Sequence, residues 1–301
     1  MRTKRSFSDA LCSFRRGPDC GETGGTGAKT GALYAVILEL LPKVPQALPV
    51  GLGSRVHAAF LALIRLIDPE LSASLHAPQE RQRPFTLSLL RESAHRQDGQ
   101  LWVSFEKPLL LRITMLKQQI YDRLMYCLLA IPDPPTLHLG TAELVIHRVL
   151  GTPESSPWSG HTNWESLVAE ASADTEVTLE FASPTVFRRG EVDLPLPVPE
   201  LVFGSYLAKW LAFSPVRLDS ALAEQGFFAR HVGVKEHRIR TVPFSDGRVT
   251  IPGFVGRCTF ILKGKLDSSI IRQVNAIADF AFYAGTGRKT THGMGMTRRV
   301  R

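Results

Sequence analysis

Hydrophobic and polar positions repeat one order of strand and helix patterns along the chain. Short apolar or alternating runs predict strands, whereas apolar positions at three- and four-residue steps predict amphipathic helices. The first half contains strand patterns at 33–41, 84–90, 100–114 and 136–149 and helix patterns at 54–67, 69–75 and 116–129. The second half contains strand patterns at 177–181, 230–243 and 250–262, helix patterns at 201–211 and 268–283, and a final short strand. Each half follows the order β-α-β-β-α-β, which predicts tandem ferredoxin-like (RRM-like) domains of the α+β class.

Local signals mark where the predicted helices of the first half begin and end. Ser54 precedes an apolar stripe and is the expected N-cap of the first helix. Asp68 and Pro69 predict the start of a second, shorter helix, as its cap and its first helical residue. His76 ends this helix, ahead of a polar and basic loop.

Turn-rich segments predict how the chain divides into domains. Residues 1–31 carry basic clusters and a Gly/Thr-rich end, and we interpret them as a flexible basic extension. Residues 32–150 are the expected N-terminal domain, and residues 174–301 are the expected C-terminal domain. Residues 151–173 are rich in turn-forming residues and are interpreted as the passage between the two.

Composition narrows the class of protein. The 301 residues are 44% hydrophobic and 21% charged, as in ordinary soluble proteins, and a formal net charge of +8 favours a polyanionic partner. Cys12, Cys20, Cys127 and Cys258 include no C-x-x-C pair, which argues against a zinc ribbon or a disulfide framework. No apolar run has the length of a membrane span or a signal-peptide core. We therefore expect a cytoplasmic protein with no membrane partner, no cofactor and no metal.

The stretch FAFYAGTGRKTTHGMGMTRRVR at 280–301 interleaves four glycines with cations and hydroxyl groups. Glycine permits close backbone approach, so amides and neighbouring cations can converge on one anion. A phosphate-binding loop is one interpretation, and two tight turns that close a β-hairpin are the other. The spacing excludes a nucleotide-binding P-loop, because Arg288 separates Gly287 from Lys289.

Several segments, in this order, resemble the CRISPR-associated endoribonucleases that cut precursor CRISPR RNA within its repeats (CRISPR-associated protein six, of the RAMP superfamily). The resemblance extends over residues 33–301 and leaves the basic extension outside. The C-terminal glycine-rich loop is the specific match, and the other segments support it. They are DPELSASLHAPQERQRPFTLS at 68–88, LEFASPTVFRRG at 179–190, DLPLPVPELVFGSYLAKW at 193–210, GFVGR at 253–257 and DFAFYAGTGRKTTHGMGMTRR at 279–299.

The resemblance implies a metal-independent RNA cleavage in a prokaryotic cytoplasm. A ribose 2′-hydroxyl would attack the adjacent phosphate and leave a 2′,3′-cyclic phosphate and a 5′-hydroxyl. This chemistry needs a base, an acid and cations near the phosphate. His76 occupies the place of the family's usual catalytic histidine, and the direction of its proton transfer is left open. His57 is a second candidate, since some branches of the family carry a histidine near the start of the first helix.

The sequence departs from the family pattern at two places. Many relatives carry a tyrosine on the first helix, where this chain has Leu61, and a lysine before the Pro-Phe-Thr strand, where it has Arg83 or Arg81. Arginine can hold a phosphate through two bonds but does not readily transfer protons. His57 could fill this gap, although its place at the edge of the apolar stripe equally suits a packing residue. The candidate catalytic residues are therefore His76, His57 and Arg83.

The resemblance also indicates which residues would contact CRISPR repeat RNA, and a solvated basic face is the alternative for these cations. A non-catalytic RAMP subunit that only holds RNA is the alternative function, and an effector complex and a homodimer remain open as partners. A metal-dependent nuclease is disfavoured, because the sequence contains no clustered carboxylates or His/Cys ligand pattern. We expect the glycine-rich loop to hold the RNA and a histidine of the first half to cut it. The expected contacts are Arg188, Arg189, Gly285, Gly287, Arg288, Lys289, Thr290, Gly293, Gly295 and Arg298.

Overall fold

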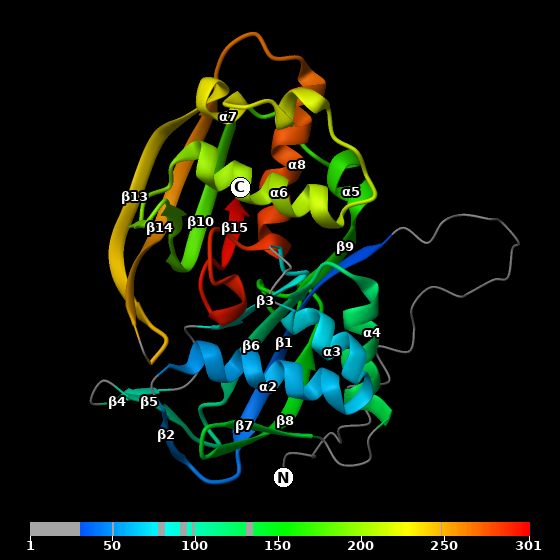
Figure 1. Ribbon diagram of the computed structural model, residues 1–301, viewed down its shortest axis with the longest axis vertical. Helices are drawn as coiled ribbons and strands as arrows, with labels where there is room; N and C mark the ends of the chain where they lie inside the picture. Colours follow the sequence, from blue (N-terminus) through cyan, green and yellow to red (C-terminus); the bar gives the residue numbers. More distant parts are fainter. Residues whose placement is uncertain are drawn as a thin grey trace, which may run out of the picture.

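The computed structural model of the protein describes residues 31–49, 51–77, 82–90, 95–97, 100–130, 135–247 and 249–301. Two α+β domains follow one another along the chain, one in the lower and one in the upper half of Figure 1. The expected N-terminal extension, residues 1–31, lies outside the described part apart from its last position. Within the described ranges, no helix is both long enough and apolar enough to cross a membrane.

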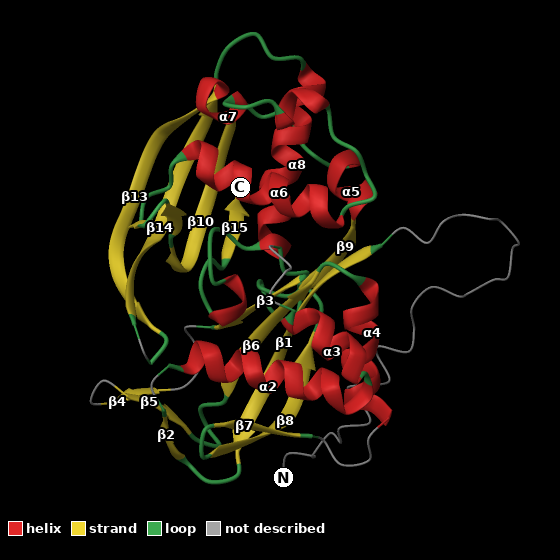
Figure 2. Cartoon of the chain, viewed as in Figure 1, coloured by secondary structure: helices red, strands yellow, loops and turns green. Residues whose placement is uncertain are grey.

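The N-terminal domain is built on a sheet with the strand order β3-β6-β1-β8-β7, in which all neighbours pair antiparallel. Helices α2, α3 and α4 pack on one face of this sheet (Figure 2). Strands β3, β6, β1 and β8 have the spatial order of a ferredoxin-like unit, with the first strand between the third and the fourth. The elements are β1 (Ala32–Pro42), α2 (Leu52–Ile67), α3 (Pro69–His76), β3 (Phe85–Leu89), β6 (Leu109–Met115), α4 (Gln118–Ala130), β7 (Thr136–Leu139) and β8 (Ala142–Leu150), with a small separate sheet of β2 (Gln46–Leu48), β4 (His95–Gln97) and β5 (Gln100–Val103).

The C-terminal domain repeats this topology with the strand order β13-β14-β10-β15. Its helices pack on one face of the sheet, and strands β13 and β14 form a long hairpin that reaches down towards the N-terminal domain (Figure 1). The fold class predicted from the sequence is therefore confirmed in both halves. The elements are β10 (Glu176–Thr185), β11 (Phe187–Arg189), β12 (Val192–Leu194), α6 (Pro199–Phe213), η1 (Ser220–Ala223), α7 (Phe227–His231), β13 (Val232–Ser245), β14 (Thr250–Leu262), α8 (Ser268–Ala284), η2 (Thr290–His292) and β15 (Thr297–Val300).

Strand β1 is apolar along most of its length because both of its faces are covered. Val36, Leu38 and Leu40 belong to the core beneath the N-terminal helices. Leu33 and Ala35 point the other way, into the core of the C-terminal domain. Successive side chains of a strand point to opposite faces, so a strand between two cores loses the usual apolar-polar alternation. The two domains therefore share a buried strand rather than meeting through a polar surface.

Two helix starts in the first half differ in how well the sequence predicted them. Asp68 caps α3 as expected, because its carboxylate accepts a hydrogen bond of 2.9 Å from the Leu71 amide. Ser54 is not the cap of α2, which begins at Leu52 after Gly51 and has no side-chain cap. Gly51 has a φ of 75° and lies against the turn of the β13–β14 hairpin, so tertiary packing determines this helix end.

Three segments of the first half and its boundary differ from the predicted elements. The expected strand 100–114 is two strands, β5 and β6, which belong to different sheets. The expected strand 136–149 is the β7–β8 hairpin, which turns at Gly140 with a φ of 73°. The turn-rich passage 151–173 contains β9 (Gly160–Asn163), which pairs with β1, and α5 (Trp164–Ala169). Trp164 is buried against Trp210 and Phe280 of the C-terminal core, which explains why this passage is ordered.

The C-terminal end of α8 is held by buried donors from both domains. Thr114 of β6 donates a hydrogen bond of 2.7 Å to the carbonyl of Tyr283. Arg112, also on β6 and 2% exposed, donates one of 2.8 Å to the carbonyl of Phe282. Lys209 of α6, on the C-terminal side, lies 2.5 Å from the Ala284 carbonyl. The last carbonyls of a helix lack partners within it and carry partial negative charge, so cations stabilise this end. The glycine-rich loop starts at this fixed point.

Candidate active site

Two of the predicted catalytic residues lie close together on the helix pair α2 and α3. The ring centroids of His57 and His76 are 6.2 Å apart. The two helices are joined by the Asp68 cap, and the Ser72 hydroxyl donates a hydrogen bond of 2.9 Å to the Leu61 carbonyl. His76, the last residue of α3, is exposed, whereas His57 is half-buried. The short turn between the helices thus brings one exposed and one half-buried imidazole to the same place.

The third predicted catalytic residue, Arg83, lies at the end of α3. Its guanidinium donates a hydrogen bond of 3.0 Å to the carbonyl of Leu75, the residue before His76. This contact supplies a cation to the unpaired carbonyls of the helix end. It also keeps a permanent positive charge beside the two histidines. Arg81, the other arginine considered from the sequence, lies outside the described residues.

A third histidine, His292, joins this cluster from the glycine-rich loop of the other domain. Its ring stacks on His57 with a centroid distance of 4.5 Å and an angle of 12° between the planes. The Nδ1 atom of His292 is hydrogen-bonded to the Thr291 hydroxyl at 2.9 Å. The loop expected to hold the RNA thus also supplies a ring to the histidine cluster. Only the tertiary structure shows this, since nothing in the spacing of the sequence relates position 292 to position 57.

Burial sets the protonation of the two stacked rings. Burial lowers the pKa of His57, a backbone hydrogen bond with Thr291 opposes this shift, and the neighbouring His76 and Arg83 add to it. Burial, together with the nearby His57 and Lys289, lowers the pKa of His292 to about 4. Both rings are therefore neutral at pH 7. The Nδ1 atom of His57 is buried and has no hydrogen-bond partner among the described residues.

The glycines of the C-terminal loop allow its backbone to pack tightly. Gly285, Gly287, Gly293 and Gly295 all have positive φ values, between 64° and 100°. A Cβ atom at Gly295 would lie 2.1 Å from the carbonyl oxygen of Thr286, whose amide donates a hydrogen bond of 2.8 Å to the Gly295 carbonyl. This contact closes the loop between α8 and β15, so the loop joins a helix to a strand and does not close a β-hairpin.

Thr290, a predicted RNA contact, is only 6% exposed and accepts a hydrogen bond of 3.2 Å from the Lys209 ammonium. This bond fixes the loop from within. The loop is thus a compact, anchored structure that presents selected side chains.

The cations predicted to bind RNA mostly lie beside carboxylates. Arg288 and Arg188 share Asp193, at 2.6 Å and 3.3 Å. Lys289 pairs at 2.5 Å with Asp246, in the turn of the β13–β14 hairpin. This pair ties the hairpin to the glycine-rich loop. The remaining two predicted cations are Arg298, 2.7 Å from Glu180, and Arg189, exposed on β11.

A groove of about 940 Å³ runs between the domains and reaches the histidine cluster. One wall comes from the start of α2 and from β3, the edge strand of the N-terminal sheet. The other wall comes from the β13–β14 hairpin, with Arg240 and Phe244. His292 and Gly293 lie at the groove as well. An aromatic ring and a cation beside a groove suit a single-stranded nucleic acid, through base stacking and phosphate contact.

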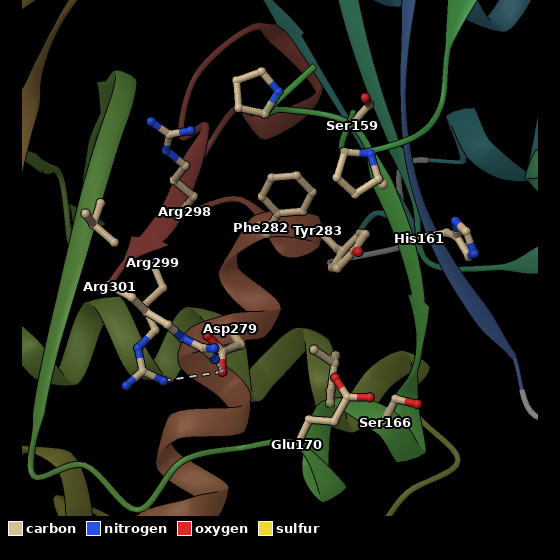
Figure 3. Close-up of a pocket in the computed structure, with 15 residues that line it drawn as sticks. Ser159, His161, Ser166, Glu170, Asp279, Phe282, Tyr283, Arg298, Arg299 and Arg301 are labelled. Carbon is tan, nitrogen blue, oxygen red and sulfur yellow. Dashed lines mark hydrogen bonds and ion pairs between the residues drawn. The ribbon is translucent and has the colours of Figure 1, made fainter. Parts of the chain in front are cut away.

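Arg298 lines a different pocket, of about 560 Å³, shown in Figure 3. There it lies near Phe282 and Tyr283, while Arg301 is ion-paired to Asp279 at the other side of the pocket (Figure 3). The two cavities have no lining residue in common. The structure thus brings His57, His76, Arg83 and the glycine-rich loop together. Arg298 also lines a pocket of about 510 Å³ that shares Ala182 and Arg240 with the groove. Among the described residues, no group of three or more His, Cys, Asp or Glu side chains is placed to hold a metal ion.

In fold, the chain resembles proteins of the RAMP class. Its structure matches a RAMP protein that binds different RNA substrates with a TM-score of 0.57 over 89% of this chain, at 16% identity, a likeness that concerns the fold alone. The family model of the CRISPR Cas6 N-terminal domain matches residues 33–169, and that of the CRISPR-associated endoribonuclease Cas6 matches residues 179–297. A Cas6 solved as a product complex is 32% identical, with a TM-score of 0.76, and the match covers 91% of this chain and all of that one. The chain belongs to the Cas6 family.

Two further relatives support this membership. A Thermus thermophilus Cas6 structure is 30% identical, with a TM-score of 0.69 over 91% of this chain and all of that one. The CRISPR-associated endoribonuclease Cas6 of Mycobacterium tuberculosis (strain CDC 1551 / Oshkosh) is 30% identical over 123 residues. That segment is 40% of this chain and spans 37% of the curated relative's length. The resemblance predicted from the sequence motifs is thus confirmed at the level of the family.

Proposed function

We propose that this protein is an endoribonuclease that cuts precursor CRISPR RNA within its repeats without a metal ion. The observation that carries the proposal is the meeting of His57, His76 and Arg83 next to His292, which lines a groove between the two domains of a Cas6 fold. Proton transfer and charge stabilisation at a phosphate need these kinds of group within one site. Membership of a family whose relatives are named CRISPR-associated endoribonucleases supports the choice of substrate.

In the proposed reaction, His57 takes the proton from a ribose 2′-hydroxyl. The neutral state that burial imposes on its ring leaves a lone pair available at pH 7. The 2′-oxygen then bonds to the adjacent phosphorus, and the bond from phosphorus to the 5′-oxygen breaks. His76, which is exposed at the end of α3, gives a proton to the departing 5′-oxygen. The products are a 2′,3′-cyclic phosphate and a 5′-hydroxyl.

Arg83 has the role of charge stabilisation rather than proton transfer. Its guanidinium is anchored on the Leu75 carbonyl, so it is held in place before the phosphate arrives. A fixed cation in a partly dry site stabilises the extra negative charge of the pentacoordinate phosphorus. Arginine remains protonated throughout, which suits this role and excludes a part in the proton transfers.

The proposal is tested by incubating the protein in EDTA with end-labelled RNA that carries the repeat of the neighbouring CRISPR array. A single cut with a 2′,3′-cyclic phosphate end is expected, and one 2′-deoxy substitution at the cut should abolish it. Tight binding without cleavage would instead identify a non-catalytic RAMP subunit. The family tyrosine and lysine that this chain lacks favour that alternative. Cleavage that is lost in EDTA and restored by magnesium would contradict the metal-independent reaction.

A further inference from the structure

The His57 ring is oriented by stacking and by a backbone hydrogen bond with Thr291, and its Nδ1 atom has no hydrogen-bond partner among the described residues. Phe85 of β3 lies on one side of the ring, with a centroid distance of 5.8 Å and an angle of 21°. His292 stacks on the ring at 4.5 Å and 12°, which is closer and more nearly parallel. Rings at such distances attract each other by more than the burial of their area. Of the two rings that constrain the plane of the His57 ring, His292 is thus the closer and the more nearly parallel.

His292 is itself held in place by its own surroundings. The Thr291 hydroxyl is bonded to its Nδ1 atom at 2.9 Å, and Thr291 is only 6% exposed. The carbonyl oxygen of His292 lies so close to α2 that a Cβ atom at Gly53 would be 2.1 Å from it. One ring nitrogen and the backbone are therefore both fixed. A ring that is fixed at two points can orient a neighbouring ring whose Nδ1 atom has no partner among the described residues.

Resting on the proposed function, we propose that His292 is a positioning residue for the cleavage reaction, whose stacked ring fixes the His57 imidazole between the two domains. The base is then presented to the RNA only when the glycine-rich loop of the C-terminal domain is docked on the N-terminal domain. Misplacement of a reacting group by about 1 Å can reduce a rate about 100-fold. His292 need not touch the reacting atoms for its loss to reduce cleavage.

Stacking also controls how much water reaches His57. The charged or titratable groups around the stacked pair are His76 and Arg83 from the N-terminal domain, and Lys289 and Asp246 from the C-terminal domain. All four remain when only the His292 ring is removed. Replacement of His292 by alanine exposes one face of His57 and weakens the burial that lowers its pKa, so this pKa should rise towards the ordinary value. Phenylalanine would keep that face covered.

Two variants, His292→Ala and His292→Phe, test the proposal. We expect His292→Ala to reduce the single-turnover cleavage rate about 10- to 100-fold, with little change in affinity for repeat RNA that is 2′-deoxy at the cut. The acidic limb of its pH-rate profile should move to higher pH. His292→Phe should restore most of the lost rate and the original limb. His161→Ala is the matched control, since His161 also lies near an aromatic ring, 6.4 Å from Tyr34, but outside this site.

A second measurement works without cleavage. The proton resonances of the His57 ring can be titrated in the free wild type and in both variants. The His57 pKa should be higher in His292→Ala than in the wild type, and unchanged in His292→Phe. An unchanged His57 pKa in His292→Ala would overturn the proposal, even if the wild type does not cleave. Equal loss of cleavage in both variants would overturn it as well, because the ring nitrogens of His292 would then act directly.

Discussion

Gly53, in the first turn of α2, lies directly against the backbone carbonyl of His292. A Cβ atom at Gly53 would be 2.1 Å from that oxygen and 3.1 Å from the ring of Phe244 on the β13–β14 hairpin. Such a distance is well inside van der Waals contact, so any side chain at position 53 must displace backbone. The N-terminal domain therefore meets two segments of the C-terminal domain at a position where only glycine fits.

Gly53→Ala should separate the glycine-rich loop from α2. We expect a loss of about 1–3 kcal/mol in the free energy of unfolding, the usual cost of forcing atoms into a packed site. Cleavage should fall further than stability alone explains, because the His57–His292 contact opens. Urea denaturation and single-turnover cleavage at 25 °C measure the two effects.

Gly204→Ala is the matched control for this prediction. Gly204 lies within α6, and nothing comes within 4 Å of an added Cβ atom. Alanine in a helix interior is more stable than glycine by about 0.5–1 kcal/mol. The control should therefore raise the urea midpoint and leave cleavage unchanged. Equal urea midpoints and equal cleavage rates of the two variants would show that the close contact at Gly53 does not limit the side chain at this position.

His76→Ala should remove cleavage while leaving affinity for repeat RNA nearly intact. A positioned acid or base contributes about 10²- to 10⁴-fold to a rate, whereas its loss removes little binding. His57→Ala should reduce the cleavage rate by a factor of the same order. His138→Ala, an exposed histidine on the edge strand β7, is the control and should cleave normally. Full activity of His76→Ala would assign the proton transfers to His57 and the groups around it.

The double variant Arg288→Ala and Lys289→Ala should weaken RNA binding and flatten its salt dependence. Each phosphate contact on a single strand contributes about 0.7 to the slope of log affinity against log salt, so two lost contacts should lower it by about 1.4. Filter binding between 50 and 300 mM KCl would measure the slope with uncleavable RNA.

The control for this charge effect is the pair Lys43→Ala and Arg65→Ala, which removes two exposed cations from the N-terminal domain. It should leave the slope unchanged. Since Arg288 and Lys289 already pair with Asp193 and Asp246, RNA must compete with these carboxylates. An unchanged slope in the loop variant would mean that both cations only hold the loop.

Lys209 should make stability depend on pH above neutrality. Burial lowers its pKa to about 7 in the folded protein, far below the ordinary value of 10.5. Between these values the unfolded chain binds a proton that the folded protein does not, so the free energy of unfolding rises with pH. The slope is at most about 1.4 kcal/mol per pH unit for one group. Urea midpoints from pH 7 to 9.5 should therefore rise for the wild type relative to Lys209→Met. Parallel curves would contradict this.

The fold was predictable because its signals are local and are repeated. Strand β14 and the start of α3 at Asp68 and Pro69 follow from alternation and from capping residues next to them in the chain. The sequence predictions failed at two places where distant contacts determine the structure. The start of α2 is determined by packing at Gly51, and the order of segment 151–173 is determined by burial of Trp164 in the other domain.

The candidate site was predictable only as far as family motifs reach. His76, His57 and Arg83 could be proposed from their places around α3, and the structure brings them together. His292 could not be proposed from the sequence, because its stacking on His57 depends on how the two domains dock. The role of Lys209 could not be predicted either, since a lysine in a helix pattern gives no sign that it is buried, 5% exposed, beneath a loop.

The capped end of α8 makes the proposed nuclease activity a property of the assembled pair of domains. Arg112 and Thr114 belong to one half and the carbonyls that they hold belong to the other, so neither half completes this end alone. Separately expressed halves should each be inactive, and any activity recovered on mixing would follow their association constant. RNA cleavage by the mixed halves would then report how much of the two chains has associated, as in a split reporter.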